Sequence, residues 1–163
     1  MRSRNGRDPH GSQADKSGSC LQVTTKEDLT VGAEDNIKVI QSIYEAFGRG
    51  DVEAILAAVT DDVDWASEAS SNVAPWYAPH EGKDGVAAFF QEFGSTVEVL
   101  EFTPTAFGSN ETDVFAIVRF RGSNRATGKQ TFQDLHDWFR FREGSVYYYR
   151  GTEDTLQTEE TLN

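Results

Sequence analysis

Four β-rich segments follow one another in the second half of the chain, separated only by short turns. They cover 97–102, 113–122, 131–142 and 145–152, and the connections between them contain GSNET, ATGK and EG. Turns this short join antiparallel strands, whereas parallel neighbours need a long crossover. Because no strand–helix–strand repeat interrupts the series, the sequence predicts one antiparallel sheet.

Helical periodicity precedes these strands. Apolar residues recur at three- and four-residue steps across 34–47, and GRG at 48–50 ends this first helix. Asp51 can cap a second, shorter helix, after which VDWAS at 63–67 alternates like a strand. A third helix over 82–93 carries Val and Phe side chains on one side. Helices followed by a sheet indicate an α+β fold.

The chain divides into three parts by composition. Residues 1–33 are rich in Gly, Ser and charge and lack periodicity, which predicts a disordered leader. The folded domain then covers 34–156, and 157–163 is a C-terminal tail. The only cysteine, Cys20, falls in the leader, and we expect it to be inert because no neighbour would lower its pKa.

The charge and the apolar runs of the chain argue against several partners. The formal net charge is −12 and no basic stripe is present, which argues against nucleic acid and against an anionic membrane surface. No apolar stretch is long enough for a transmembrane helix or a signal peptide, so the expected location is the cytoplasm. We find no Cys/His metal-ligand spacing and no phosphate-cradling glycine loop, and we therefore expect neither a metal nor a cofactor.

Several motifs resemble a known family in their order and spacing. They are IYEAFGRGDVEAILAAVTDDVDW, the later PW and HEGKDGVAAFFQEF, the ATGK turn and the closing FREGSVYYYRGTEDT. Over 34–156 the chain is similar to the SnoaL-like polyketide cyclase and ketosteroid isomerase branch of the nuclear transport factor 2-like superfamily. The resemblance implies a cone, in which a curved, mainly antiparallel sheet wraps around three N-terminal helices. It also implies a mainly apolar pocket at the wide end and a homodimer through the outer sheet face.

One acid stands in the middle of the strand predicted at 131–142. Period-two alternation puts four residues on the more uniformly apolar face, which we expect to be the concave one: Leu135, Asp137, Phe139 and Phe141. DWFRF at 137–141 resembles the isomerase strand that carries the oxyanion-hole acid, which implies that Asp137 donates a hydrogen bond to a developing enolate.

We expect desolvation to raise the pKa of Asp137 so far that the carboxyl is neutral near pH 7. The alternative is that the strand's two faces are swapped near the turn. Asp137 would then lie in solvent, paired with Arg140 or Arg142.

The other isomerase groups are less well matched. The oxyanion-hole tyrosine aligns with Ile43, and Tyr44 is one step away, either as a second donor or as a core tyrosine with its hydroxyl at the pocket rim. The catalytic aspartate aligns with Ser67, which cannot act as the base. Two candidates remain for that role: His80, near the expected pocket mouth, and Glu68, which needs a bulge to face inward.

The remaining pocket candidates are mostly aromatic. The residues predicted to bind a flat hydrophobic molecule, with Ser67, are Trp65, Phe90, Phe139, Tyr147 and Tyr149. The same rings also fit a plain core. His136 and Trp138, on the opposite face, are predicted dimer contacts or surface residues. Epoxide hydrolase chemistry is not supported, because the positions of its Arg and two Asp hold Val118, Phe120 and Gly151.

Two functions fit this sequence. In the first, Asp137 with Tyr44 polarises a ketone of a small hydrophobic molecule while His80 or Glu68 moves a proton, as in an isomerase or cyclase. In the second, the domain is a non-catalytic binding or stress-associated module that holds an apolar metabolite. The missing base at Ser67 favours the second function, and the buried acid favours the first.

Overall fold

A single six-stranded sheet and the helices on one of its faces make up the described part of the chain. The computed structural model describes residues 26–163. Its elements are α1 (Lys26–Arg49), α2 (Val52–Ala57), β1 (Val59–Ser67), the 3₁₀ helix η1 (Pro75–Tyr77), β2 (His80–Glu81), α3 (Gly82–Thr96), β3 (Val97–Ser109), β4 (Asp113–Asn124), β5 (Gln130–Arg142), β6 (Ser145–Thr152) and α4 (Thr155–Leu162). The strand order is β2-β1-β6-β5-β4-β3. Among the described strands only β1 and β6 pair parallel, so the predicted α+β class with a mainly antiparallel sheet is confirmed.

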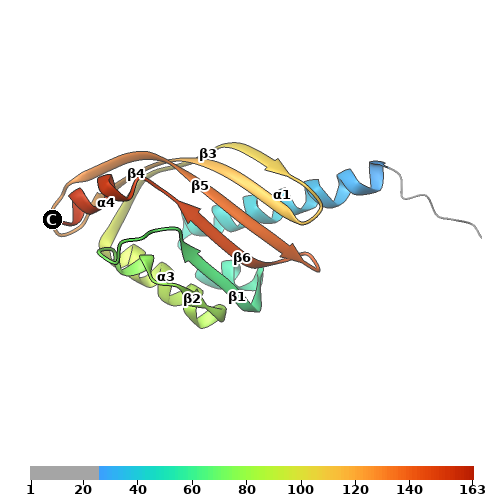
Figure 1. Ribbon diagram of the computed structural model, residues 1–163, viewed down its shortest axis with the longest axis horizontal. Coiled ribbons are helices and arrows are strands. Elements are labelled where there is room, and N and C mark those ends of the chain that lie inside the picture. Colours follow the sequence, from blue (N-terminus) through green and yellow to red (C-terminus); the bar gives the residue numbers. More distant parts are fainter. Residues whose placement is uncertain (1–25) are drawn as a thin grey trace, which may run out of the picture.

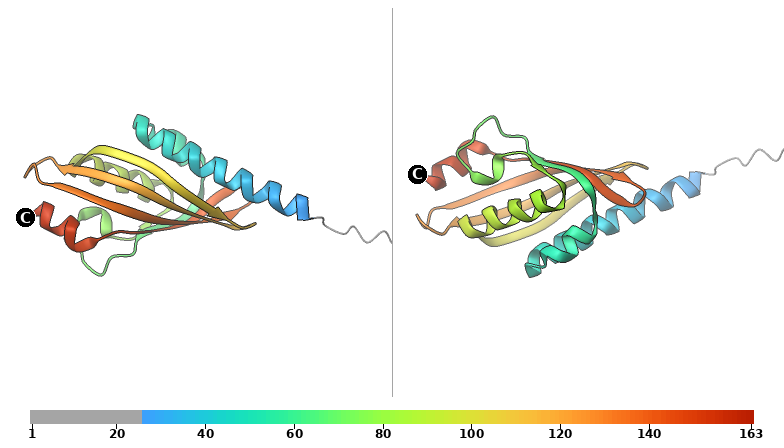
Figure 2. Two further views of the ribbon diagram at one scale, coloured as in Figure 1. Left: turned by 90° about the horizontal axis from the view of Figure 1, so that it is seen from above. Right: turned by 90° about the horizontal axis from the view of Figure 1, so that it is seen from below.

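The sheet is strongly curved, and the long strands β3 to β6 arch over α1 and α3 (Figure 1). Figure 2 shows the same arrangement from above and below. Strand β3 contains two register shifts against β4, between Val99 and Glu101 and between Pro104 and Ala106. Such irregularities bend a strand and increase its twist. They help to close the sheet around the helices.

Alternation along the strands separates the two faces of the sheet. In β4 the buried residues Val114, Ala116 and Val118 alternate with the exposed Phe115 and Ile117. The buried set packs with the apolar sides of α1, α2 and α3 in one core. Removal of this apolar surface from water is the main force that holds helices and sheet together.

Two local features of the sequence act as expected. The Asp51 side chain caps α2 by accepting a hydrogen bond from the backbone N–H of Ala54 at 3.1 Å. In the turn between β5 and β6, Glu143 and Gly144 both have positive φ angles, of 52° and 80°. Two consecutive positive φ values are typical of the tight turns that match the twist of a hairpin.

The structure differs from the predicted boundaries at both ends. Helix α1 begins at Lys26, eight residues before the start predicted at Glu34. In the sequence, Ala33 and Leu29 continue backward the four-residue step from Ile37, a signal that the charged and glycine-containing surroundings concealed. Residues 1–25 of the predicted leader, with Cys20, lie outside the described residues.

The segment 157–163, predicted as a tail, forms most of helix α4. The Asp154 side chain caps this helix by accepting from the backbone N–H of Gln157, and Thr158 is buried. The Gln157 side-chain oxygen in turn accepts from the backbone N–H of Phe132, which fixes α4 to β5. No helix within 26–163 is long and apolar enough to cross a membrane.

Candidate functional site

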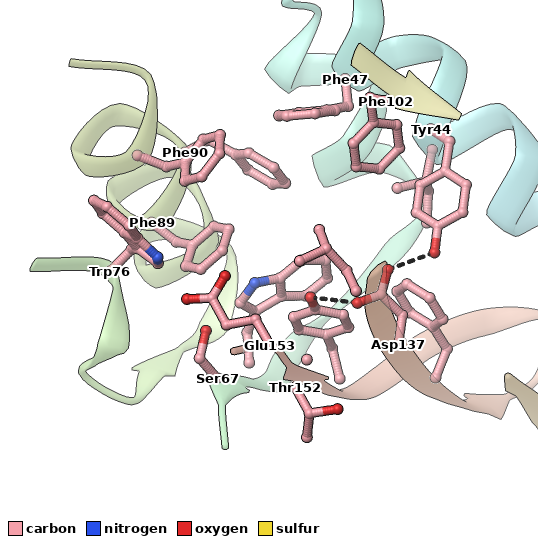
Figure 3. A pocket seen from close by; sticks show the side chains of 17 residues that line it. Tyr44, Phe47, Ser67, Trp76, Phe89, Phe90, Phe102, Asp137, Thr152 and Glu153 are labelled. Atoms are coloured by element: carbon pink, nitrogen blue, oxygen red, sulfur yellow. Dashed lines mark hydrogen bonds between the residues drawn. The ribbon is translucent and has the colours of Figure 1, made fainter. Parts of the chain in front are cut away.

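A cavity of about 90 Å³ lies between α1, α3 and the concave face of the sheet (Figure 3). Most of its wall is aromatic, and its polar groups come mainly from β1, β5 and the end of β6. The lining residues are Ile43, Tyr44, Phe47, Trp65, Ser67, Trp76, Phe89, Phe90, Phe93, Phe102, Leu135, Asp137, Phe139, Tyr149, Gly151, Thr152 and Glu153.

Asp137 is buried in this wall, with 6% of its surface exposed. The Tyr44 hydroxyl donates to its Oδ2 at 2.6 Å, and the Tyr149 hydroxyl donates to its Oδ1 at 2.9 Å (Figure 3). Among residues 32–163, whose side chains the structure describes, no cationic side chain forms an ion pair with it. The predicted inward face of β5 is therefore the observed one, and the alternative with Asp137 in solvent is wrong.

The pKa of Asp137 is raised from 3.8 to about 6, because burial disfavours the charged carboxylate. The hydrogen bonds from Tyr44 and Tyr149 oppose this rise, since they stabilise the charged form. The predicted direction agrees with this result, but the carboxyl is mainly ionised at pH 7 rather than neutral. Sequence reasoning treated the surrounding rings as apolar walls and did not foresee that two of them donate hydrogen bonds to the acid.

Both tyrosines are held firmly in position. Tyr44 comes from α1, and its ring packs edge-on against Phe102 with 5.1 Å between the ring centroids. Tyr149 comes from β6 and stacks on Trp65 at 4.1 Å. Burial and the charge of Asp137 raise the pKa of each hydroxyl well above its ordinary range, so both stay protonated as donors.

Gly151 makes room for the Tyr149 hydroxyl. It is the cross-strand partner of Asp137. A Cβ atom at this position would meet the Tyr149 hydroxyl oxygen and would lie 3.0 Å from the ring carbon that carries it. The missing side chain thus allows Tyr149 to reach across its own strand to the acid on β5.

A second carboxyl group, on Glu153, also lines the cavity. It follows β6 and accepts a hydrogen bond from the buried Tyr77 of η1. Burial is the main cause that raises its pKa, and the charge of Asp137 contributes. Sequence reasoning missed Glu153 because it lies beyond the end of a strand, where no periodic pattern assigns a direction to the side chain.

Most of the predicted site residues meet at this cavity. Tyr44, Trp65, Ser67, Phe90, Phe139 and Tyr149 line it together with Asp137. The Ser67 hydroxyl lies on the same side as Glu153 in Figure 3, away from Asp137. Glu68 is exposed, and its carboxylate pairs with Arg150 at 3.2 Å instead of facing inward.

Two predicted residues do not line the cavity. His80 is buried behind Phe89, with 5.6 Å between the ring centroids, and its Nε2 lies 3.2 Å from Glu92 Oε2. Tyr147 lies at a register shift: Arg140 pairs with Tyr148, but Phe141 pairs with Val146. This bulge changes the side to which the strand's residues point, so Tyr147 does not share the face of Tyr149.

Within the described part of the chain, no three His, Cys, Asp or Glu side chains come together as a possible metal site. Asp137 and Glu153 line one cavity, but their nearest polar neighbours are tyrosine, glutamine and threonine side chains. The arrangement is suited to hydrogen bonding and proton transfer.

Comparison with known proteins assigns the chain to a family. The family model of the SnoaL-like domain matches residues 40–149. No curated protein matches the chain.

Among solved structures, an NTF2-like protein from Burkholderia xenovorans is 23% identical with a TM-score of 0.72, covering 80% of this chain and 98% of that one. An NTF2-like protein from Burkholderia pseudomallei is 22% identical with a TM-score of 0.73, covering 79% and 98%. TerC, crystallised with polyporic acid, is 19% identical with a TM-score of 0.70, covering 78% and 98%. At these identities the likeness shows a common fold.

Proposed function

The chain belongs to the SnoaL-like domain family, and we propose that it binds a small hydrophobic ketone or phenol and transfers a proton at a carbon next to the oxygen-bearing carbon. This is chemistry of the isomerase or cyclase type. The observation that carries the proposal is the Asp137 carboxyl, which is buried among aromatic rings, accepts two tyrosine hydroxyls and has a pKa of about 6. A general acid or base works best when its pKa lies near the operating pH.

Asp137 in its ionised form is the proton acceptor. Its carboxylate takes a proton from the carbon next to the substrate carbonyl, and the electrons of that C–H bond form a carbon–carbon double bond. The carbonyl electrons move onto the oxygen and give an enolate. Negative charge therefore moves from the carboxylate to the substrate oxygen during the step.

The hydroxyls of Tyr44 and Tyr149 stabilise the negative charge both on the Asp137 carboxylate and on the substrate oxygen. Before the step they donate to the carboxylate of Asp137. Once the carboxyl is neutral, the same donors can turn to the enolate oxygen, so little reorganisation is needed as the charge moves. Return of the proton to another carbon completes an isomerisation. In a cyclisation the enolate carbon attacks a second carbonyl, and the alkoxide formed there takes the proton from Asp137.

This mechanism needs no second base. Ser67 cannot accept the proton, His80 is behind Phe89, and Glu68 is paired with Arg150 outside the cavity. The role that sequence reasoning gave to His80 or Glu68 therefore passes to Asp137.

A second candidate function is non-catalytic binding of an apolar metabolite. Ser67 favours it, because the position of the isomerase base holds a group that cannot shuttle protons. The aromatic cavity wall would serve such binding equally well.

Hydrogen exchange separates the two functions. We expect the protein to accelerate deuterium incorporation next to the carbonyl of 2-tetralone in D₂O, measured by proton NMR, and Asp137→Asn to abolish the acceleration. Tyr147→Phe, which removes a hydroxyl outside the cavity, should leave it unchanged. Binding of 2-tetralone and of the enolate mimic 2-naphthol without exchange would establish the non-catalytic function instead. The proposal fails in both forms if neither molecule binds in calorimetric titrations.

We also propose that two copies associate through the outer face of the sheet. Exposed apolar side chains gather there: Phe115 is 49% exposed, Ile117 38% and Phe132 59%. The ring of Trp138, on the same face, stacks on Phe115 at 6.0 Å. Apolar groups clustered on an otherwise strongly charged surface are typical of an interface. Light scattering at micromolar concentration tests this association.

A further inference from the structure

The cavity has a second polar end, which the proposed proton transfer at Asp137 does not use. In Figure 3 the carboxyl groups of Asp137 and Glu153 lie on opposite sides of the cavity. The sheet register places the Ser67 part of this end two strands away from the acid, because Gly151 on β6 pairs with Asp137 on one side and with Ser67 on the other. Neighbouring strands are about 4.8 Å apart, so the backbones at Asp137 and Ser67 are about 10 Å apart.

Hydrogen bonds from neighbouring protein side chains hold the Glu153 carboxyl group in position. The Tyr77 hydroxyl donates to its Oε1, and the Gln133 amide lies 3.5 Å from its Oε2. Gln133 is itself anchored, because it accepts from the backbone N–H of Asp154 at 2.7 Å and donates to Thr158 at 3.1 Å. These contacts come from η1, β5 and the start of α4, and they hold the carboxylate in the cavity wall.

These contacts leave hydrogen-bonding capacity toward the cavity. An ionised carboxylate accepts about four hydrogen bonds, and Tyr77, Thr158 and the long contact to Gln133 account for three at most. Among the side chains described, those of 32–163, no cation pairs with Glu153. A partly satisfied carboxylate in a cavity wall is costly unless a ligand supplies a donor. The Ser67 hydroxyl, which also lines the cavity, can both donate and accept at this end.

We infer that Glu153 accepts a hydrogen bond from a hydroxyl group of the ligand. The ligand class is therefore a flat hydrophobic molecule with an oxygen function at each end, a carbonyl or enol at Asp137 and a hydroxyl at Glu153. This inference rests on the proposed function, because it takes the Asp137 end as the reacting end. Two fused six-membered rings with an oxygen at each end have the shape to span the cavity.

A pair of probes tests the inference: 2-naphthol, with one hydroxyl, and 2,6-dihydroxynaphthalene, with a second hydroxyl at the far end. A hydrogen bond to a charged acceptor predicts that the diol binds at least about tenfold more tightly than 2-naphthol. Glu153→Gln, which keeps an acceptor for Tyr77, should remove most of this advantage and leave the affinity for 2-naphthol unchanged. Glu153→Leu should remove the advantage as well. Glu160→Gln, an exposed change on α4, is the matched control and should retain it.

The outcomes separate this inference from the proposed function. If the two probes bind equally well to the wild type, or if Glu153→Gln leaves the diol's advantage intact, the role of Glu153 is refuted while the proton transfer at Asp137 stands. If Asp137→Asn leaves the deuterium exchange of 2-tetralone unchanged, the proposed chemistry fails. The hydroxyl site still stands in that case if the tighter binding of the diol depends on Glu153. If neither probe binds, both fail. A loss of affinity for both probes in Glu153→Gln would identify a purely structural residue.

Discussion

Removal of the Tyr44 hydroxyl tests whether the two tyrosine donors set the pKa of Asp137. The hydroxyl donates to the carboxylate and stabilises its charged form, so Tyr44→Phe should raise the pKa. A hydrogen bond to a charged group contributes about 1.5–3 kcal/mol, and one pKa unit corresponds to about 1.36 kcal/mol. The pKa should therefore rise by about one to two units, from about 6 to between about 7 and 8.

The structure also ranks the two tyrosines. The bond from Tyr44 is 2.6 Å long and that from Tyr149 is 2.9 Å, so Tyr44→Phe should shift the pKa more than Tyr149→Phe. The Phe ring keeps the contact with Phe102, which separates the loss of the hydroxyl from a loss of packing. The same change should move the inflection of the pH profile for 2-tetralone exchange upward, because a larger share of Asp137 is then protonated at neutral pH.

Carboxyl-carbon NMR on protein labelled at aspartate measures the midpoint directly, and the signal missing from Asp137→Asn assigns it. Tyr147→Phe is the control, because the Tyr147 ring contacts the guanidinium groups of Arg140 and Arg142 outside the cavity. A wild-type midpoint at or below 3.8 would show a solvated or ion-paired aspartate and refute the reasoning. A midpoint that Tyr44→Phe shifts no more than Tyr147→Phe would refute the role of the hydroxyl.

Three further predictions concern stability, geometry and assembly. The folded-state pKa of Asp137 lies above its unfolded value by about 6 − 3.8, or about 2.2 units, so its contribution to stability is present below about pH 4 and is lost as the pH rises through about 6. In urea titrations, the unfolding free energy of Asp137→Asn relative to the wild type should rise by about 3 kcal/mol between about pH 3 and 7, and a flat difference would contradict this. Gly151→Ala should displace the Tyr149 hydroxyl and raise the NMR midpoint of Asp137 as Tyr149→Phe does, whereas the double variant should show no further rise. Phe132→Lys should convert a dimer into a monomer in light scattering, and a monomeric wild type would exclude the proposed interface.

Residues inside regular strands could be placed from the sequence, because successive side chains of a strand point to alternate faces of the sheet. Asp137 and Phe139 lie two residues apart on β5, and both face the cavity as predicted. The same rule failed for Tyr147, because a bulge in β6 opposite Arg140 and Phe141 changes the face to which its side chains point. A bulge is set by how two strands pair, and a single strand's sequence carries no signal of it.

The chemistry of the site depended on contacts between distant segments. The bond from Tyr44 to Asp137 joins residues 93 positions apart, and the resemblance to isomerases placed their tyrosine at Ile43, with Tyr44 one step away. Both residues line the cavity, but only the folded helix shows which one reaches the acid. The bond from Tyr149 depends on the missing side chain of Gly151, its neighbour but one, which matters only because Gly151 is opposite Asp137 in the sheet register.

The same burial that makes Asp137 costly for the fold suits it to the proton transfer that we propose. In water its carboxyl would have a pKa near 3.8 and would be too weak a base to take a proton from carbon, whereas a carboxyl buried without donors would be neutral at pH 7 and unable to accept one. The two tyrosine hydroxyls hold the pKa between these limits, at about 6, so that the carboxylate is both abundant and more basic than in water. Asn at this position would avoid the cost and lose the proton acceptor. The stability gained by Asp137→Asn above pH 6 and its loss of exchange activity are therefore two measurements of one cause, and they should appear together.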